Sequence, residues 1–250
     1  MIAHRGAPRR APENTIAAFR AAVEMGVDAV EFDVLAMSRG PLVVAHSDRL
    51  EEITHGRVGG RIGDRSFDEL RVLAPDLPTF DETLAWFADE GRGVVLHVDL
   101  KLHSRLDELA AAVERHGLAG RVVVSAFHSA VLRQVAAASP RIRIGFTYPD
   151  DLLGVSRRRA LWPLVRVGLS TMRATLPSRL GRLLGRAGAT AVMLNHTLVT
   201  SRAVNRAHAI GVPVLTWTVD DPAVVLRVVE AGVDAVISND PEMVMATLGS

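Results

Sequence analysis

Cysteine is absent from this chain of 250 residues. The chain therefore forms no disulfide bond and offers no thiolate ligand to a metal. No apolar run approaches the roughly 20 residues that a membrane-spanning helix needs. Aromatic residues make up only 4% of the sequence and no known nucleic-acid-binding module is visible, so nucleic acid is not an expected partner. Polar residues begin almost directly at the N-terminus, and we expect no signal peptide and a cytoplasmic location.

Lysine is nearly absent as well. The 29 basic residues comprise 28 arginines and Lys101 alone. A chain that uses arginine for generic positive charge has reason to keep a lysine where a compact ammonium fits and a planar guanidinium does not. Chance retention is the alternative. Lys101 is therefore a candidate functional residue.

Acidic residues are missing from a run of 68 residues, 152–219, which carries ten arginines. The rest of the chain holds all 28 acids and 19 basic residues, a net charge of −9. Such polarity indicates either an anionic partner or substrate, or several solvated helix faces in an arginine-rich chain.

A short motif recurs along the chain: a glycine followed by an apolar run rich in β-branched residues. It begins at Gly26, Gly188, Gly211 and Gly232. Glycine just past a helix is the preferred left-handed stop. The run after it is typical of a buried parallel strand. Further strands are predicted at 2–5, 42–46, 94–100, 121–126 and 142–147.

Helical patterns lie between these strands. A helix is predicted after a possible cap at Asn14, and two more after Asp221-Pro222 and Asp240-Pro241. About eight strand–helix units in one chain favour an α/β fold of the TIM (β/α)₈ barrel type. A doubly wound open sheet is the alternative, but no Gly-x-Gly-x-x-Gly turn follows the first strand.

Two segments interrupt this rhythm. Residues 47–80 are rich in charge and glycine, and we interpret them as an insertion near the barrel mouth. Residues 150–186 are predicted to be irregular, because Pro163 and Pro177 should prevent one continuous helix. Neither has the composition of a linker, so the chain is predicted to be a single domain over 1–250.

Ionisable residues inside the apolar strands are the candidate site, because TIM barrels react at the C-terminal ends of their strands. Glu31 and Asp33 are two apart and share one strand face, and Asp99 and Lys101 repeat that geometry. Three carboxylates at one barrel mouth would repel one another unless a cation lay between them. Oxygen ligands favour Mg²⁺ or Ca²⁺. A salt bridge to an arginine is the alternative for any one acid.

His4 and His46 each end a predicted strand. Two imidazoles beside a bound phosphate could act as the acid and the base of its cleavage. Of the other histidines only His97 points to the same side as Asp99, and we assign it, with the remaining six, to surface or packing positions.

Several short motifs follow one another along the chain: His4-Arg5-Gly6, Pro12-Glu13-Asn14-Thr15, Glu31-Phe32-Asp33, His46, Trp217-Thr218-Val219-Asp220 and Asn239-Asp240-Pro241. In this order they resemble the glycerophosphodiester phosphodiesterase family, over nearly the entire chain. The resemblance implies a TIM barrel. It also implies Glu31 and Asp33 as metal ligands, His4 and His46 as the catalytic pair, Arg5 as a phosphate contact, Trp217 as part of the substrate wall, and Glu13 and Asn14 as supports of the first loop.

Three positions depart from the family pattern. Asp99 stands where the family usually has glutamate in Glu-x-Lys, so the third ligand is one methylene shorter, while Lys101 falls on the family's lysine. Ser47 replaces the aspartate that usually follows the histidine, so the role of that aspartate is lost or moved. Arg39-Gly40 replaces the usual Asp-Gly turn. None of these changes removes a catalytic group.

The function that the resemblance implies is metal-dependent hydrolysis of a small-molecule glycerophosphodiester to glycerol 3-phosphate and an alcohol. The metal, Arg5 and Lys101 would neutralise phosphate charge that grows in the transition state. One histidine would activate water or the substrate's own hydroxyl, and the other would protonate the leaving alcohol. The sequence leaves open which histidine does which.

Two alternatives remain at this stage. The enzyme could instead cleave lysophospholipids or sphingomyelin-type lipids, since related barrels also use aspartate as the third ligand. The arginine-rich region would then contact an anionic membrane surface, with Leu161, Trp162 and Leu164 beside Arg157 to Arg159. Alternatively, the barrel could bind phosphate esters without cleaving them, for which Ser47 and Asp99 are the support.

Overall fold

Eight parallel strands close into a barrel in the computed structural model, which describes residues 1–150 and 162–249. The barrel strands are β1 (Ile2–Ala3), β2 (Ala29–Ala36), β4 (Val95–Leu100), β5 (Val122–Ala126), β6 (Arg143–Tyr148), β7 (Ala191–Asn195), β8 (Val214–Trp217) and β9 (Ala235–Ser238). The short strand β1 closes the ring, because it pairs in parallel with both β2 and β9. The predicted TIM barrel is confirmed.

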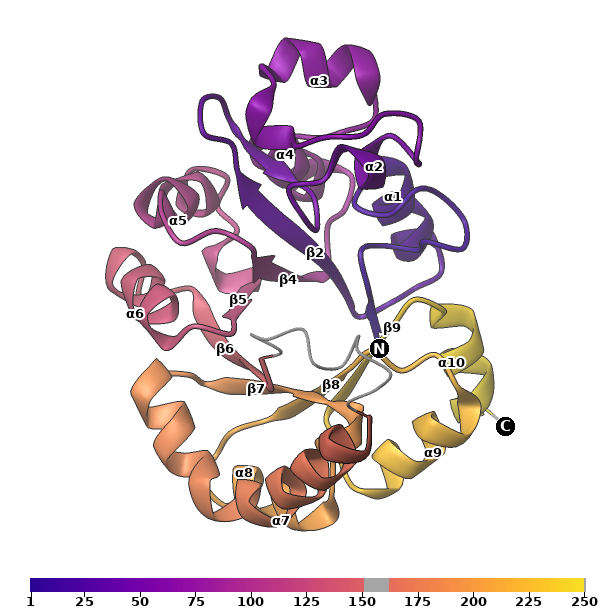
Figure 1. Cartoon of the computed structure of the whole chain (residues 1–250), viewed down its shortest axis with the longest axis vertical. Coiled ribbons are helices and arrows are strands. Elements are labelled where there is room, and N and C mark those ends of the chain that lie inside the picture. Colours follow the sequence, from indigo (N-terminus) through magenta and orange to yellow (C-terminus); the bar gives the residue numbers. More distant parts are fainter. Residues whose placement is uncertain (151–161, 250) are drawn as a thin grey trace.

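Helices form a ring outside these strands (Figure 1). They are α1 (Ile16–Glu24), α4 (Phe80–Asp89), α5 (Leu106–Arg115), α6 (Ser129–Ala138), α7 (Trp162–Ala187), α8 (Ser201–His208), α9 (Pro222–Glu230) and α10 (Pro241–Gly249), with 3₁₀ turns η2 (Ala119–Arg121) and η5 (His196–Leu198). The predicted caps at Asp221 and Asp240 are confirmed, since each carboxylate accepts backbone N–H groups of the following helix. The cap predicted at Asn14 is wrong: Thr15 caps α1 and accepts from Ala18 N.

Strand β2 shows how the sequence separates core from site. Its residues alternate between two faces, as a strand requires. Phe32 points outward and packs against the rings of Phe19, Phe80 and Phe87, with centroids 5.4 to 6.4 Å apart. The residues on either side of Phe32 therefore face the barrel interior, and both are acidic.

A hairpin carries β2 beyond the barrel. Strand β3 (Leu42–Val44) pairs antiparallel with the end of β2, with Ala36 opposite Leu42 and Val34 opposite Val44. Since the chain runs back along β2, the residues after Val44 return toward the level of Asp33. This reversal brings His46 to the same end of the barrel as the β2 acids.

Between β3 and α4 the chain forms α2 (Leu50–Ile53), η1 (Ile62–Asp64) and α3 (Phe67–Leu73). These elements surround a separate apolar cluster in which Leu50, Ile62 and Leu70 are fully buried. Asp48 fastens the segment, because its carboxylate accepts from Gly63 N at 2.7 Å and from an arginine side chain nearby. Figure 1 shows α3 at the outer edge of the molecule, away from the barrel.

Helix α7 contradicts the prediction of an irregular stretch over 150–186 for residues 162–186, while residues 151–161 lie outside the described residues. It is one helix of 26 residues with Pro177 inside it, and Pro163 falls in its first turn, where a missing N–H is tolerated. Leu176, Leu180 and Leu184 recur every four residues and are buried in the main core. Burying each contributes about 1.5–3 kcal/mol, enough together to offset the roughly 3 kcal/mol that an interior proline costs.

The predicted membrane contact is only partly within the described structure. Arg157 to Arg159 and Leu161 lie outside the described residues, as do the side chains of Trp162 and Leu164. Across residues 1–150 and 162–249, no helix has the combined length and apolar character needed to cross a bilayer.

Candidate active site

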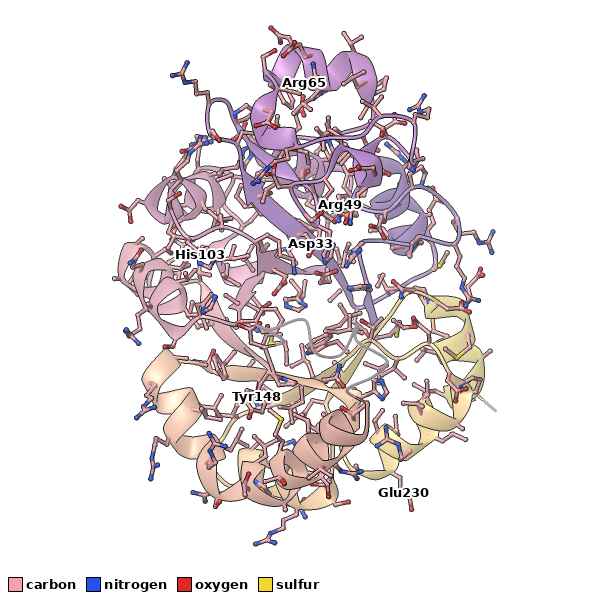
Figure 2. All side chains as sticks on the ribbon, in the orientation of Figure 1. Asp33, Arg49, Arg65, His103, Tyr148 and Glu230 are labelled. Carbon is pink, nitrogen blue, oxygen red and sulfur yellow. The ribbon has the colours of Figure 1, made fainter. Side chains whose placement is uncertain are left out.

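A cavity of about 180 Å³ opens at the C-terminal ends of the barrel strands. It brings together every site residue predicted from the sequence: His4, Arg5, Glu31, Asp33, His46, Asp99, Lys101 and Trp217. Figure 2 shows Asp33 near the middle of the molecule, inside the ring of helices, whereas Arg65 lies at its outer edge.

Glu31, Asp33 and Asp99 form a buried acidic triad. Each offers a carboxylate oxygen, and the three oxygens lie within 4.8 Å of one another. Burial, followed by the charges of Asp33 and Asp99, raises the pKa of Glu31 well above its ordinary value. These groups fit a divalent metal, because a hard cation prefers oxygen ligands and relieves the repulsion among them.

Two basic side chains reach into the same triad. Lys101 Nζ lies 2.5 Å from Asp99 Oδ2 and 3.1 Å from Asp33 Oδ1, and Arg5 Nε lies 3.1 Å from Asp33 Oδ2. Burial opposes ionisation of Asp33, but the charges of Lys101 and Arg5 outweigh it and lower its pKa to about 2. Burial likewise opposes the charge of Lys101, yet Asp99 and Asp33 raise its pKa, so it stays protonated.

The first loop is folded tightly around these groups. Asn14 Nδ2 donates to Asp33 Oδ2 at 2.9 Å, and its Oδ1 accepts from Asp33 N at 3.2 Å. Asn14 has a left-handed backbone, with φ of 59°. Gly6 has φ of 83°, and a Cβ there would lie 2.7 Å from the backbone of Ala18. Arg5 also pairs with Glu13 at 2.9 Å, so the motif residues of this loop contact one another as well as Asp33.

His4 is held through a chain of hydrogen bonds from the C-terminal end of β9. Asn239 Nδ2 donates to Asp220 Oδ2 at 2.6 Å, which orients the amide, because a carboxylate only accepts. Asn239 Oδ1 therefore faces His4 Nδ1, 2.6 Å away, and accepts its proton. Burial, and then the charge of Arg5, lower the pKa of His4, so the ring is neutral at pH 7. Its Nε2 carries the lone pair, 3.9 Å from Glu31 Oε2.

His46 approaches the site from a different element. It follows β3, its side chain is about one-third exposed, and its Nδ1 lies 3.4 Å from Glu52 Oε2. The aspartate that usually follows this histidine in the resembled family is replaced by Ser47, whose buried hydroxyl has no hydrogen-bond partner within the described residues. Asp48, one residue later, makes the anchoring contacts of the segment instead.

A buried histidine that lines the cavity and a fully buried serine behind it connect to Asp99 through hydrogen bonds, and neither was predicted as a site residue from the sequence. His97 Nε2 lies 2.8 Å from Ser125 Oγ, which in turn donates to Asp99 Oδ1 at 2.5 Å. Burial lowers the pKa of His97 to about 4, so it is neutral and its Nε2–H donates to the serine. The strand alternation that placed His97 beside Asp99 was the signal for it. Nothing in the local sequence distinguishes Ser125 from any strand hydroxyl.

The opposite wall of the cavity is mostly apolar. Phe127, Met193, Trp217 and Ile237 line it. Phe127 and Trp217 meet edge to face with ring centroids 6.1 Å apart, and Trp217 Nε1 donates to Met193 O at 3.1 Å. The cavity therefore offers charge on one side and carbon on the other, an arrangement suited to a phosphate that carries organic substituents.

A TIM barrel with this constellation at its mouth defines a class of metal-assisted phosphate-ester enzymes. Residues 4–243 match the model of the glycerophosphoryl diester phosphodiesterase family, and the chain belongs to that family. The prediction that it is an enzyme of this family is confirmed.

Relatives with full-length similarity support this assignment. A glycerophosphodiester phosphodiesterase of Caldanaerobacter subterraneus subsp. tengcongensis is 28% identical, over 97% of this chain and 94% of its own. A putative glycerophosphodiester phosphodiesterase of Bacillus subtilis is 27% identical, over 98% and 96%.

Solved structures share the fold. A putative glycerophosphoryl diester phosphodiesterase from Silicibacter pomeroyi superposes with a TM-score of 0.79 at 25% identity, covering 99% of this chain and 92% of that one. A phosphodiesterase from Oleispira antarctica, solved in complex with the product sn-glycerol-3-phosphate, gives a TM-score of 0.77 at 23% identity, covering 100% and 96%.

Proposed function

We propose that the protein hydrolyses small glycerophosphodiesters to glycerol 3-phosphate and an alcohol, with the help of a divalent cation. The observation that carries the proposal is the convergence of three buried carboxylates, two cationic side chains and two histidines on one cavity. The bound product in the Oleispira structure supports glycerol 3-phosphate as the phosphate-containing product.

Glu31, Asp33 and Asp99 would hold the cation, and their oxygen donors favour Mg²⁺ or Ca²⁺. When bound, the cation would supply positive charge to phosphate oxygens. Arg5 and Lys101 stand on either side of Asp33 and would contact the same phosphate. Trp217 would form the wall against the organic part of the substrate.

The two histidines would move the protons. His4 presents the lone pair of Nε2 toward the triad, which favours it as the acceptor of the proton of the attacking hydroxyl. As the new P–O bond forms, the P–O bond to the alcohol breaks, and His46 would donate a proton to the departing oxygen. With water as nucleophile, one step completes the hydrolysis. With a neighbouring substrate hydroxyl, a cyclic phosphate forms first. Water would then open it with the roles reversed: His46 would accept the proton of water, and His4 would return its proton to the substrate oxygen as the ring P–O bond breaks.

The direct test is release of glycerol 3-phosphate from glycerophosphocholine and glycerophosphoethanolamine. We expect release to stop with EDTA and to return when Mg²⁺ or Ca²⁺ is added in excess, because the triad lacks its charge partner without a cation. Absence of release with either cation would contradict the proposal.

Replacing either histidine should separate chemistry from binding. His4→Ala and His46→Ala are each expected to lower kcat at least about 100-fold with KM nearly unchanged, because general acid–base catalysis contributes that much and the phosphate contacts remain. Steady-state kinetics with glycerophosphocholine measures both constants, and thermal melting verifies the fold. Near-normal turnover by either variant would show that the histidine has no part in the chemistry.

The alternatives from the sequence are not favoured. The two relatives described above carry the name of glycerophosphodiester phosphodiesterase, and each proposed acid–base and metal position in this chain has a side chain capable of its role.

We further propose that residues 1–250 form a single domain, in which 47–80 is an insertion near the mouth, and that the protein is cytoplasmic. Co-sedimentation with anionic vesicles at low salt tests whether the arginine-rich residues 152–219 contact a membrane surface.

A further inference from the structure

The ring of His46 separates two cavities. One face borders the main cavity, and the ring also borders a smaller one of about 50 Å³, lined by Glu13, Glu52, Ile53, His55 and Asp76 among others. Within residues 1–150 and 162–249, His46 is the one residue that lines both. A group that binds Nδ1 from the side of the smaller cavity would therefore fix the orientation of the ring, and with it the direction in which Nε2 faces the main cavity.

Glu52 is the residue in position to do so. Its Oε2 lies 3.4 Å from His46 Nδ1 and is shielded from solvent. No hydrogen-bond donor in residues 1–150 or 162–249 satisfies that oxygen. A shielded carboxylate oxygen without a donor costs about 1–3 kcal/mol, and a side-chain adjustment of a few tenths of an ångström would bring the two atoms to hydrogen-bond distance.

The surrounding structure holds Glu52 in place. It lies in α2, whose first residue, Leu50, is fully buried and donates its N–H to Gly60 O at 3.0 Å. Thr54 closes the helix, since its Oγ1 donates to Leu50 O at 2.7 Å and accepts from Val58 N at 3.1 Å. Glu52 is thus presented to His46 by a short, tightly fastened turn.

We propose that Glu52 is the positioning residue of His46: its carboxylate accepts the Nδ1–H of the imidazole, fixes the ring orientation and tautomer, and so turns Nε2 toward the main cavity. The proposal rests on the proposed function in taking His46 as a catalytic group. The counterpart for His4 is the Asn239 amide, which also accepts from Nδ1. Both rings would then present Nε2 to the substrate: His4 as a neutral acceptor, and His46 as an imidazolium that donates its Nε2–H and keeps its Nδ1–H on Glu52.

The tautomer of His46 tests the contact without any assay of activity. Long-range ¹H–¹⁵N correlation spectra at pH 8 should show the Nδ1–H form of His46 in the wild type. In Glu52→Ala the ring should shift toward the Nε2–H form that an unconstrained neutral histidine prefers. Glu52→Gln keeps the shape of the side chain and should give an intermediate spectrum, because an amide can donate as well as accept.

A matched control is one residue away. Glu51 carries the same charge on α2, and its contact with Arg49, at 3.8 Å, is exposed and weak. Glu51→Ala should leave both the His46 tautomer and kcat unchanged. Glu52→Ala should lower kcat about 10- to 100-fold with little change in KM, as loss of a group that orients a functional histidine does. In a His46→Ala background it should add no further loss.

The outcomes separate this proposal from the function on which it rests. An Nδ1–H tautomer unchanged in Glu52→Ala, or a kcat equal to wild type while His46→Ala is inactive, would overturn the role of Glu52. Full activity of His46→Ala would instead refute the catalytic role of His46, whatever the spectra show.

Discussion

The ammonium of Lys101 occupies the gap between two carboxylates of the triad, 2.5 Å from Asp99 Oδ2 and 3.1 Å from Asp33 Oδ1. The lone lysine of the chain thus lies where the composition suggested, at a point that needs a compact charge. A guanidinium is planar and wider, and it would have to displace one of the carboxylates or withdraw from them.

We therefore expect Lys101→Arg to fold but to have low catalytic activity. We expect kcat/KM to fall at least about tenfold, because the charge is kept while its position is lost. Lys101→Met should in addition be destabilised by about 3–5 kcal/mol, since it leaves buried Asp33 and Asp99 without that partner. Urea unfolding and kinetics measure the two effects, and Arg20→Lys on α1 controls for the exchange itself. Wild-type kinetics for Lys101→Arg would contradict the prediction, because the shape of the cationic group at position 101 would then have no effect on catalysis.

Among the elements, α4 supports the hairpin that carries His46. Val44 N donates to Pro78 O at 3.0 Å, just before the helix, and Thr79 caps it. Thr79 Oγ1 accepts from Glu82 N at 3.0 Å while Glu82 Oε2 accepts from Thr79 N at 2.8 Å. A backbone hydrogen bond and the helix cap that follows it therefore connect the end of β3 to the start of α4.

The charge of Glu82 makes this junction dependent on pH. Partial burial opposes its ionisation, but the Thr79 N–H and the Arg71 guanidinium outweigh that and lower its pKa. A lowered folded-state pKa gives stability that is present above the ordinary pKa and is lost as pH falls through the folded value. Glu82→Gln should thus cost about 0.3–1 kcal/mol at pH 7, a modest figure because the pair is exposed, and progressively less as the pH is lowered from 7 to 3. Urea unfolding of the wild type and Glu82→Gln at pH 7 and pH 3 measures this. A difference in unfolding free energy that is the same at both pH values would contradict the prediction.

At the scale of the whole molecule, the acidic triad exists only when β2 and β4 are paired. Its members come from β2 and β4, which pair with Glu31 opposite His97 and Asp33 opposite Asp99. An unfolded chain does not hold Asp99 near Glu31 and Asp33, because Asp99 lies far from them in the sequence. A cation that binds the triad therefore binds the folded state alone and stabilises it.

Mg²⁺ or Ca²⁺ should accordingly raise Tm. At a concentration 100 times Kd the gain is about 2.7 kcal/mol, or roughly 5–10 °C for a chain of this size. Asp99→Asn should keep most of the fold and lose most of that shift. Differential scanning fluorimetry with EDTA and with each cation measures it, and an equal shift in Asp99→Asn would place the bound cation elsewhere.

Local patterns were enough to predict the barrel and the ionisable residues at its mouth, because strands carry their period-two signal within a few residues, whereas Trp217 was predicted only from the family resemblance. The strand predicted at 94–100 is observed as Val95–Leu100, and its polar residues face the cavity. What escaped prediction depends on distant parts of the chain. Asn14 is drawn away from capping α1 by Asp33, 19 residues later, and α7 continues through Pro177 because its leucines are buried against the barrel. Glu52 faces His46 only after the 47–80 segment has folded.

Seven of the eight predicted site side chains stand on barrel strands or directly after them, and His46 alone comes from the hairpin beyond β2. On heating, such a hairpin loosens before a closed barrel does, because it has fewer hydrogen-bonded neighbours. The temperature at which turnover fails should therefore lie below the temperature at which the molecule melts. In the proposed mechanism, a change in the hairpin would therefore alter the position of His46, which would face the leaving alcohol, while the proposed phosphate contacts at the ends of the barrel strands would stay in place.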